Sequence, residues 1–419
     1  MTGEGLALLR QQVPEGVRDR LPGEAYRLRE VTGRLLDLFR RWGYREVVTP
    51  AFEFLETVAA GEGSRPEDCY RFFDRRGRTL ALRPDMTAAV ARLAATRLAG
   101  EPLPLRLSYW GPVFRRREER AGALHEIWQS GVEQVGLAGG PADAELIALA
   151  CEALAEAGLE GFQVSVGHVA FLEGVLEEAG VTPAQAAGIR EALAARDLVA
   201  FEAVAREAPG AELLLAVAAF RGSAQEAAAR FGHLANPRIA RALGELQAAF
   251  ALLEAYGVAD RVALDLALVR SFGYYTGVVF EGYAPGVGAP VLGGGRYDGL
   301  LAAFAGDGQP IPAVGFALDL DRVLTALGRQ GQPPAEPALD LLLVPEPGAE
   351  GLALAEARQL RRAGLAVEVE LERRTPEERA AYVKARRIRE VRTVSAGGRG
   401  RGRVALRTRP RPPGVISIH

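Results

Sequence analysis

LRLSYWGPVFRRREERAGALHEIWQSGVEQVG, residues 105–136, is the stretch that decides the fold. It holds two runs of strand-forming residues, and a charged loop at 118–123 lies between them. A strand, a polar loop and a second strand predict an antiparallel pair. Because side chains alternate between the faces of a strand, Gln129 and Glu133 share one face with Gly131 between them. The stretch therefore predicts an antiparallel sheet with polar groups on one face.

That polar face has the chemistry to hold an amino acid. Arg115 follows the first strand, and Gln129 and Glu133 lie on its partner. A carboxylate and an amide beside an arginine can bind the ammonium and carboxylate groups of an amino acid. Gly131 would leave room for a ligand on the sheet. The alternative is a solvated strand face with a common cross-strand Arg–Glu pair, and these residues alone fit both interpretations equally.

Two further regions are candidates for the same site. LRPDMTAAVAR, residues 82–92, predicts a helix start with Asp85 in the N-cap region and Thr87 in the first turn, and by itself this pattern favours a simple cap. LVRSFGYYTGVVFEGY (268–283) and VLGGGRYDGL (291–300) combine paired tyrosines with glycines that allow close backbone approach to a ligand. Their alternative is a bulged edge strand with tyrosines in the core. They lack the signatures of a P-loop or a dinucleotide-binding motif.

Composition excludes several classes of protein. The 419 residues are 48% hydrophobic and 25% charged, with a net charge of −2, which argues against a general binder of nucleic acids or acidic membranes. Two cysteines exclude a disulfide framework, and the histidines lie too far apart for a helical metal pair. No signal-peptide pattern and no apolar run of about 18 residues is found. We expect a soluble, cytoplasmic protein.

The chain divides into a large and a small part. Residues 1–325 alternate helical and strand patterns, and an Ala/Leu/Glu-rich segment at about 174–256 predicts a helical insertion. A Pro/Gly-rich linker is predicted at 326–338. Residues 339–419 predict a small α/β domain with an Arg/Gly/Pro-rich end. The predicted fold class is α+β.

Several motifs in order carry a specific resemblance. PEGVRDRLP, LRPDMTAAVARL, VFR…HEIWQSGVEQVG, YYTGVVFEGY, GGRYDGL and AVGFALDLDR resemble the histidyl-tRNA synthetase-like class II fold over roughly residues 13–325. The tail more weakly resembles that family's anticodon-binding domain. The resemblance implies an antiparallel sheet flanked by helices, a helical insertion, and a dimer formed through the N-terminal helix and strand.

The family's histidine pocket can be carried over residue by residue. The resemblance implies that the α-ammonium lies near Asp85 and Glu133, and that the glutamine and the tyrosines contact the ligand. The implied histidine-binding residues are Asp85, Thr87, Arg115, Gln129, Glu133, Arg270, Tyr274 and Tyr275.

The family contains true synthetases and the regulatory subunits of ATP phosphoribosyltransferase, and departures on the ATP side favour the latter. Pro-Asp-Met-Thr replaces the synthetase's Pro-Glu-Gly-Thr, and residues 122–125 lack the two arginines of its motif-2 loop. Gly273 replaces an aspartate, and Asp319 replaces a glycine, which adds a negative charge near a polyphosphate. Arg115, Arg270 and Arg322 instead match synthetase arginines.

The resemblance implies a non-catalytic regulatory subunit. It would be needed for the activity of a short-form catalytic subunit and for feedback inhibition by histidine in the first step of L-histidine biosynthesis. We expect no cofactor or metal, a hetero-oligomer with the catalytic subunit (a hetero-octamer by resemblance), self-association as a dimer, and no membrane or nucleic-acid partner. The alternatives are a histidyl-tRNA synthetase and a sensor of uncharged tRNA that uses the Arg-rich end after Arg399.

Overall fold

The structure, a computed structural model, describes residues 11–60, 68–116, 124–270, 273–333 and 337–396. It divides into two compact units, Met1–Pro334 and Ala335–His419. The division falls inside the predicted linker, although helix α12 (Leu320–Arg329) occupies the first residues of that segment. The motif-2 loop at 118–123 and the Arg-rich end lie outside the described residues.

An eight-stranded sheet forms the centre of the larger unit, in the order β1-β5-β6-β11-β10-β9-β7-β8. The predicted hairpin is confirmed, since β5 and β6 pair antiparallel along their full length. The sheet is antiparallel through its centre and mixed at its edges, where β1 pairs parallel with β5 and β8 pairs parallel with β7. The strands are β1 Arg45–Glu46, β5 Leu105–Phe114, β6 Glu126–Val135, β7 Gln163–His168, β8 Val262–Leu264, β9 Val278–Tyr283, β10 Leu292–Arg296 and β11 Ala313–Asp319.

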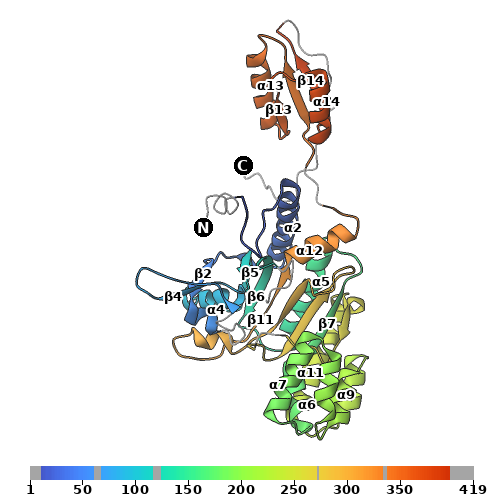
Figure 1. The fold of residues 1–419 in the computed structure, drawn as a ribbon. Helices are drawn as coiled ribbons and strands as arrows, with labels where there is room; N and C mark the ends of the chain where they lie inside the picture. The colour runs from blue at the N-terminus through green and yellow to red at the C-terminus, as the bar shows by residue number, and fades with distance from the viewer. Residues whose placement is uncertain (1–10, 61–67, 117–123, 271–272, 334–336, 397–419) are drawn as a thin grey trace, which may run out of the picture. The chain divides into compact units, whose positions relative to one another are not determined.

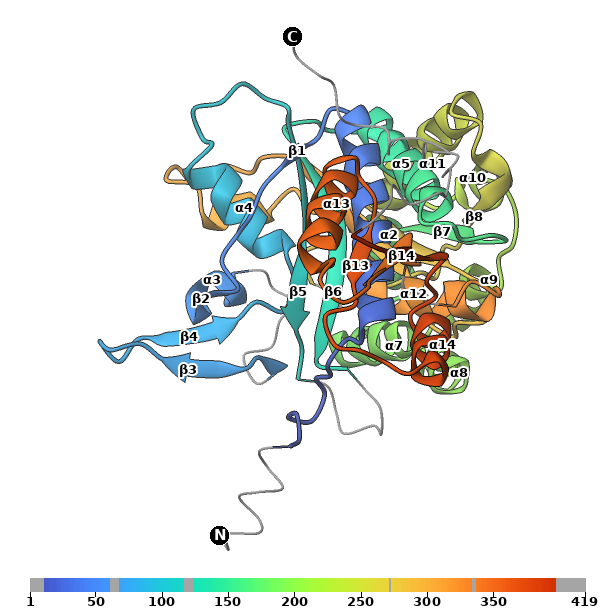
Figure 2. The ribbon, with the colours of Figure 1, turned by 90° about the horizontal axis from the view of Figure 1, so that it is seen from above.

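Helices cover both faces of this sheet. Helix α2 (Pro22–Arg41) begins with a proline in its first turn and turns its buried stripe, including Val31, Leu35 and Phe39, toward the sheet. Helix α5 (Gly140–Glu156) packs beside α2, and α4 (Thr87–Thr96) lies on the other side of β5 and β6, as Figure 2 shows. The 3-10 helix η3 (Leu300–Ala303) packs against α4.

The predicted helical insertion is present and begins at Val169, a few residues before the predicted start. Figure 1 shows these helices gathered beside one end of the sheet. Thr182 and Ser223 form capping boxes at the starts of α7 and α10. The helices are α6 Val169–Glu178, α7 Pro183–Ala195, α8 Leu198–Arg206, α9 Ala211–Ala218, α10 Ala224–Phe231 and α11 Pro237–Ala255, followed by the 3-10 helix η2 Ala259–Arg261.

A three-stranded antiparallel sheet, in the order β2-β4-β3, leads the chain to α4. It consists of β2 (Phe52–Phe54), β3 (Arg71–Phe73) and β4 (Thr79–Leu82), with helix α3 (Leu55–Ala59) packed beside it. Because β4 ends just before Asp85, this sheet sets where α4 starts.

The smaller unit is the predicted α/β module. Its three parallel strands have the order β13-β12-β14, and an apolar core of leucine, valine and alanine joins them to α13. Its elements are β12 Leu341–Pro345, α13 Glu350–Arg362, β13 Val367–Val369, α14 Pro376–Ala385 and β14 Glu390–Val394. Among the helices of the described residues, none is both long and apolar enough to cross a bilayer.

A buried ion pair ties α5 to β10 and gives a stability prediction. The Arg296 guanidinium lies 2.6 Å from Asp143, and the two side chains are 5% and 1% exposed. Asp143→Ala would leave the buried arginine without its buried carboxylate partner, while the partly exposed Asp298 and two backbone carbonyls remain, so we expect a loss of about 3 kcal/mol in the free energy of unfolding. Urea unfolding followed by tryptophan fluorescence measures it, since Trp42, Trp110 and Trp128 all belong to the larger unit.

The matched control is the exposed pair Arg206–Glu202 on α8. Glu202→Ala should change the free energy of unfolding by about 0.5 kcal/mol or less. Equal losses in the two variants would contradict a structural role for the buried pair.

Candidate functional site

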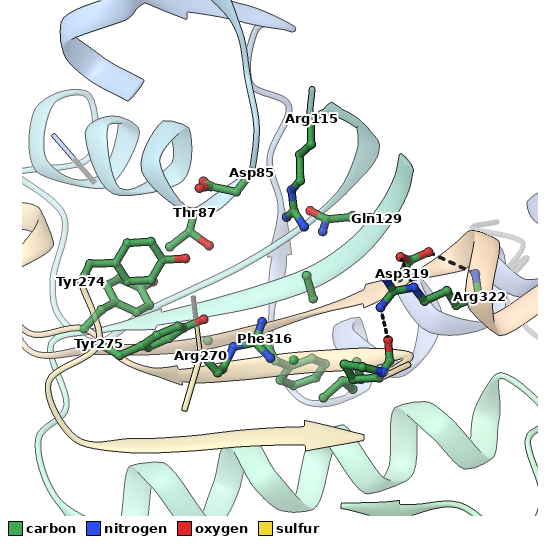
Figure 3. A pocket seen from close by; sticks show the side chains of 16 residues that line it. Asp85, Thr87, Arg115, Gln129, Arg270, Tyr274, Tyr275, Phe316, Asp319 and Arg322 are labelled. Carbon is green, nitrogen blue, oxygen red and sulfur yellow. Dashed lines mark hydrogen bonds and ion pairs between the residues drawn. The ribbon is translucent and has the colours of Figure 1, made fainter. Parts of the chain in front are cut away.

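A cavity of about 620 Å³, counting the space open to solvent, lies over β6, β10 and β11; we call it the sheet cavity. All of the predicted histidine-binding residues except Glu133 line it. Figure 3 shows Asp85 and Thr87 above the strands, Tyr274 and Tyr275 at one end, and Asp319 and Arg322 at the other. Residues from four distant segments therefore converge on one volume, which is of the size that suits a small molecule.

Asp85 combines both interpretations of its motif. Its Oδ1 accepts a hydrogen bond from the Ala88 backbone N–H at 3.0 Å, so it caps the first turn of α4. The same carboxyl lines the sheet cavity and is 7% exposed. Burial raises its pKa, although Ala88 and the Arg115 guanidinium oppose this shift. The hydrogen bond to the first turn of α4 thus fixes the position of the Asp85 carboxyl group in the cavity wall.

Glu133 is not placed as predicted. It does not line the sheet cavity, and only 1% of its surface is exposed. Its Oε1 accepts hydrogen bonds from the hydroxyls of Thr87 at 2.8 Å and Tyr109 at 3.1 Å, and its Oε2 accepts one from Tyr297. Glu133 is therefore joined by hydrogen bonds to Thr87 and Tyr297, which do line the cavity. Burial outweighs these hydrogen bonds and raises its pKa to about 7.

The glycines of the site make room for its own side chains. Gly131, which was expected to leave room for a ligand, does not line the cavity, whereas Gly293 and Gly315 do. A Cβ at Gly131 would lie 2.7 Å from the Tyr109 hydroxyl, and one at Gly295 would lie 2.7 Å from the Tyr275 ring. A Cβ at Gly293 would collide with the Arg270 guanidinium, and one at Gly315 with the Glu133 carboxylate. The alternative of a bulged edge strand is excluded, because β10 lies inside the sheet between β9 and β11.

The arginines of the sheet cavity are held in place by neighbouring oxygens. Arg115 donates from Nε to the Pro84 carbonyl at 2.7 Å. Arg270 donates from Nη1 to Glu281 of β9 at 2.9 Å. Fixed cations such as these can orient a carboxylate without reorganising.

At the opposite end of the cavity, Asp319 and Arg322 are paired with each other. Asp319 caps α12 by accepting from the Arg322 N–H at 3.0 Å, and its Oδ2 lies 3.1 Å from Arg322 Nε. Arg322 also donates to the Pro290 carbonyl at 2.6 Å. This end of the cavity thus already holds a paired anion and cation.

Several lining residues were outside the predicted set. Tyr297 belongs to the GGRYDGL motif, but the sequence does not show that its hydroxyl donates to Glu133, so its place in the site could not be predicted. The others are Pro290, Leu292, Gly293, Gly315, Phe316, Ala317, Asp319 and Arg322. Within the described residues, no group of three or more His, Cys, Asp or Glu side chains could hold a metal ion.

Comparison with known proteins assigns the chain to a family. The family model for histidyl-tRNA synthetase matches residues 16–323. The ATP phosphoribosyltransferase regulatory subunit of Symbiobacterium thermophilum is 59% identical over 388 residues, which cover 91% of this chain and 96% of that protein. The chain belongs to the ATP phosphoribosyltransferase regulatory subunits. The subunit of Moorella thermoacetica is 48% identical, over 90% of this chain and 96% of its own length.

Solved structures agree with this family assignment. A protein from Bacillus halodurans described as an ATP phosphoribosyltransferase regulatory subunit/histidyl-tRNA synthetase superposes with a TM-score of 0.81 at 30% identity, covering 92% of this chain and 99% of that one. The histidyl-tRNA synthetase of Nostoc sp. PCC 7120 gives a TM-score of 0.78 at 21% identity over 92% and 91% of the two chains. The latter likeness shows that the regulatory-subunit family and the synthetase share the fold.

The raised pKa of Glu133 predicts a pH-dependent stability term. The folded protein keeps a proton up to about pH 7 that the unfolded chain releases near pH 4.5, so this term is fully present below pH 4.5 and is lost as the pH rises to about 7. Glu133→Gln removes the titration. Between pH 5 and pH 8, the unfolding free energy of wild type should fall by about 2–3 kcal/mol relative to this variant. Urea unfolding at both pH values measures it, and a difference that does not change with pH would contradict it.

Proposed function

We propose that this chain binds histidine in the sheet cavity and transmits its occupancy to a separate catalytic subunit of ATP phosphoribosyltransferase. The observation that carries the proposal is the convergence of the predicted residues on one cavity in a chain of this family. Histidine would thereby inhibit the first step of its own biosynthesis. The chain would also be needed for the activity of the catalytic subunit while carrying no catalytic activity of its own.

The geometry favours one orientation of the amino acid. Its α-ammonium would lie at Asp85 and Thr87, and the Thr87 hydroxyl, which donates to Glu133 at 2.8 Å, would present a lone pair to the ammonium. Its carboxylate would face Arg115, and its imidazole would lie toward Tyr274 and Tyr275. Hydrogen bonds between charged partners in such a buried site are stronger than neutral ones, which supports selective binding of a zwitterion.

Feedback follows from linkage. If histidine binds one conformation of the complex more tightly than the other, its binding shifts the equilibrium toward that conformation by the difference in binding free energy. The substrates of the catalytic subunit then change the affinity for histidine by the same factor. A coupling of about 2 kcal/mol would change affinity roughly 30-fold. We propose that the partner is the short-form catalytic subunit, that this chain also self-associates, and that both act in the cytoplasm.

One observation favours a second candidate, a histidyl-tRNA synthetase. Arg115, Arg270 and Arg322, which match synthetase arginines by resemblance, all line the sheet cavity. Against it, Arg322 is paired with Asp319, whose carboxylate would repel a polyphosphate. Pyrophosphate exchange with histidine and ATP separates the two, because only the synthetase would catalyse it.

Calorimetric titration with histidine tests the binding proposal. Asp85→Asn keeps a capping oxygen for α4 but removes the charge that faces the ammonium, so histidine should bind about 10- to 100-fold more weakly. The matched control is Asp197→Asn, since Asp197 caps α8 by accepting from the Ala200 N–H at 2.9 Å. Equal affinity in wild type and Asp85→Asn would reject the proposed site, and no histidine binding by wild type would reject the function.

A second prediction concerns nucleotide exclusion at the other end of the cavity. Asp319→Asn keeps the cap of α12 and removes the negative charge, so ATP–Mg²⁺ should bind at least about 10-fold more tightly than to wild type. Calorimetry measures this, again with Asp197→Asn as control. Tight ATP binding by the wild type, unchanged in the variant, would show that Asp319 does not exclude the nucleotide.

A further inference from the structure

One arginine of the helical insertion reaches the strand beside the sheet cavity from a strained backbone position. Arg196 directly follows α7, and its φ of 58° places it in the left-handed region. Glycine and asparagine are the usual residues at this position after a helix, because most side chains are strained there. A long cationic side chain in such a conformation indicates that the side chain itself has a role.

The guanidinium of Arg196 is held against β9. Its Nη2 donates to Oε2 of Glu281 at 2.6 Å, and its Cζ lies 4.8 Å from the centre of the Tyr283 ring. The Tyr283 hydroxyl donates to the same Oε2. The side chain of Arg196 is 51% exposed, whereas that of Glu281 is 10% exposed. A surface arginine is therefore fixed on a largely buried carboxylate.

The other oxygen of Glu281 binds an arginine of the sheet cavity. Arg270 donates from Nη1 to Oε1 of Glu281 at 2.9 Å. In the pairing of β9 with β10, Glu281 lies opposite Gly293, and a Cβ at Gly293 would lie 1.8 Å from Arg270 Nη1. The guanidinium thus occupies the space that a side chain on β10 would fill. Because Gly293 and Arg270 both line the sheet cavity, this cation lies in the cavity wall (Figure 3).

Glu281 is therefore shared by two guanidinium groups, one from the insertion and one from the cavity. One carboxylate balances one cation, so the contact of Arg196, Glu281 and Arg270 has an excess of positive charge. Charges only a few ångströms apart and largely removed from water interact strongly. Arg196 thus offsets the negative charge that would otherwise act on Arg270 alone.

The other charged groups that act on Glu281 are engaged elsewhere. Asp265 repels Glu281, but it accepts a hydrogen bond from the Ala267 backbone N–H at 3.1 Å and pairs with neither of the two arginines. Arg322 attracts Glu281, but its ion pair is with Asp319. The direct balance at Glu281 is therefore set by the two arginines that contact it.

We propose that Arg196 is a positioning residue for the ligand carboxylate in the sheet cavity, and that it acts through Glu281 on Arg270. The inference rests on the proposed function, in which the ligand is histidine. With Arg196 in place, Glu281 orients Arg270 without fully neutralising it, so Arg270 attracts the histidine carboxylate together with Arg115. Without Arg196, Glu281 pairs with Arg270 alone, and its charge repels that carboxylate.

This contact makes the packing of the helical insertion part of the histidine site. Arg196 ends α7 of the insertion, whereas Glu281 belongs to β9 of the sheet. If histidine binds more tightly when Arg196 contacts Glu281, linkage requires that bound histidine stabilises this contact by the same factor. The insertion is therefore held more firmly on the sheet when the cavity is occupied.

Calorimetric titration of the full chain with histidine tests the role of Arg196. Arg196→Asn removes the cation and suits the left-handed backbone, so histidine should bind at least about threefold more weakly than to wild type. Arg196→Lys keeps the charge, so its affinity should stay within about twofold of wild type. The matched control is Arg387→Asn, which should leave the affinity unchanged, since Arg387 also has a positive φ, 49°, but belongs to the smaller unit.

A ligand without the carboxylate separates this role from a structural one. Histidinol has a hydroxymethyl group in place of the carboxylate, so its affinity, measured by competition against histidine, should not fall in Arg196→Asn. The inference is overturned if Arg196→Asn binds histidine like wild type, if Arg196→Lys loses as much affinity as Arg196→Asn, or if histidinol loses as much as histidine. Wild type that fails to bind histidine at all instead rejects the proposed function, and this inference with it.

Discussion

The buried carboxylate of Glu133 is the group on which the architecture of the sheet cavity depends. Its hydrogen-bond donors come from the first turn of α4, from the middle of β5 and from the residue after β10. Three segments that are remote in the chain are therefore fixed around one carboxyl group. The strand opposite must have no side chain at that point, which is why β11 places Gly315 in register with Glu133. Hydrogen bonds to the Glu133 carboxyl group thus fix the floor of the cavity.

Features determined by neighbouring residues were predictable from the sequence. The β5–β6 hairpin, the cap of α4 and the capped helices of the insertion all follow from periodicity and turn chemistry within short windows. The set of cavity residues came from resemblance, and the structure brings them together except for Glu133. The expectation for Gly131 was wrong, because a gap that suits a ligand and a gap that suits a side chain of the protein have the same sequence pattern.

Contacts between distant segments could not be predicted in this way. Tyr297 and Glu133 are 164 positions apart, and only the folded sheet places one hydroxyl on the other carboxylate. The parallel pairing of β1 and β8 at the sheet edges also joins segments far apart, so no local pattern marks it.

Asp85 performs two tasks with one carboxylate, and this has an evolutionary consequence. A substitution that removes the charge of the Asp85 carboxylate also removes the cap of α4, which costs about 1 kcal/mol of stability. The exceptions are residues such as Asn or Ser, which are themselves good caps. Most substitutions of Asp85 that would abolish the proposed binding of histidine therefore also destabilise the fold, and selection for stability alone would eliminate them. Under the proposed function, histidine binding could be lost through this residue by only a few replacements, because the others also destabilise the helix beside it.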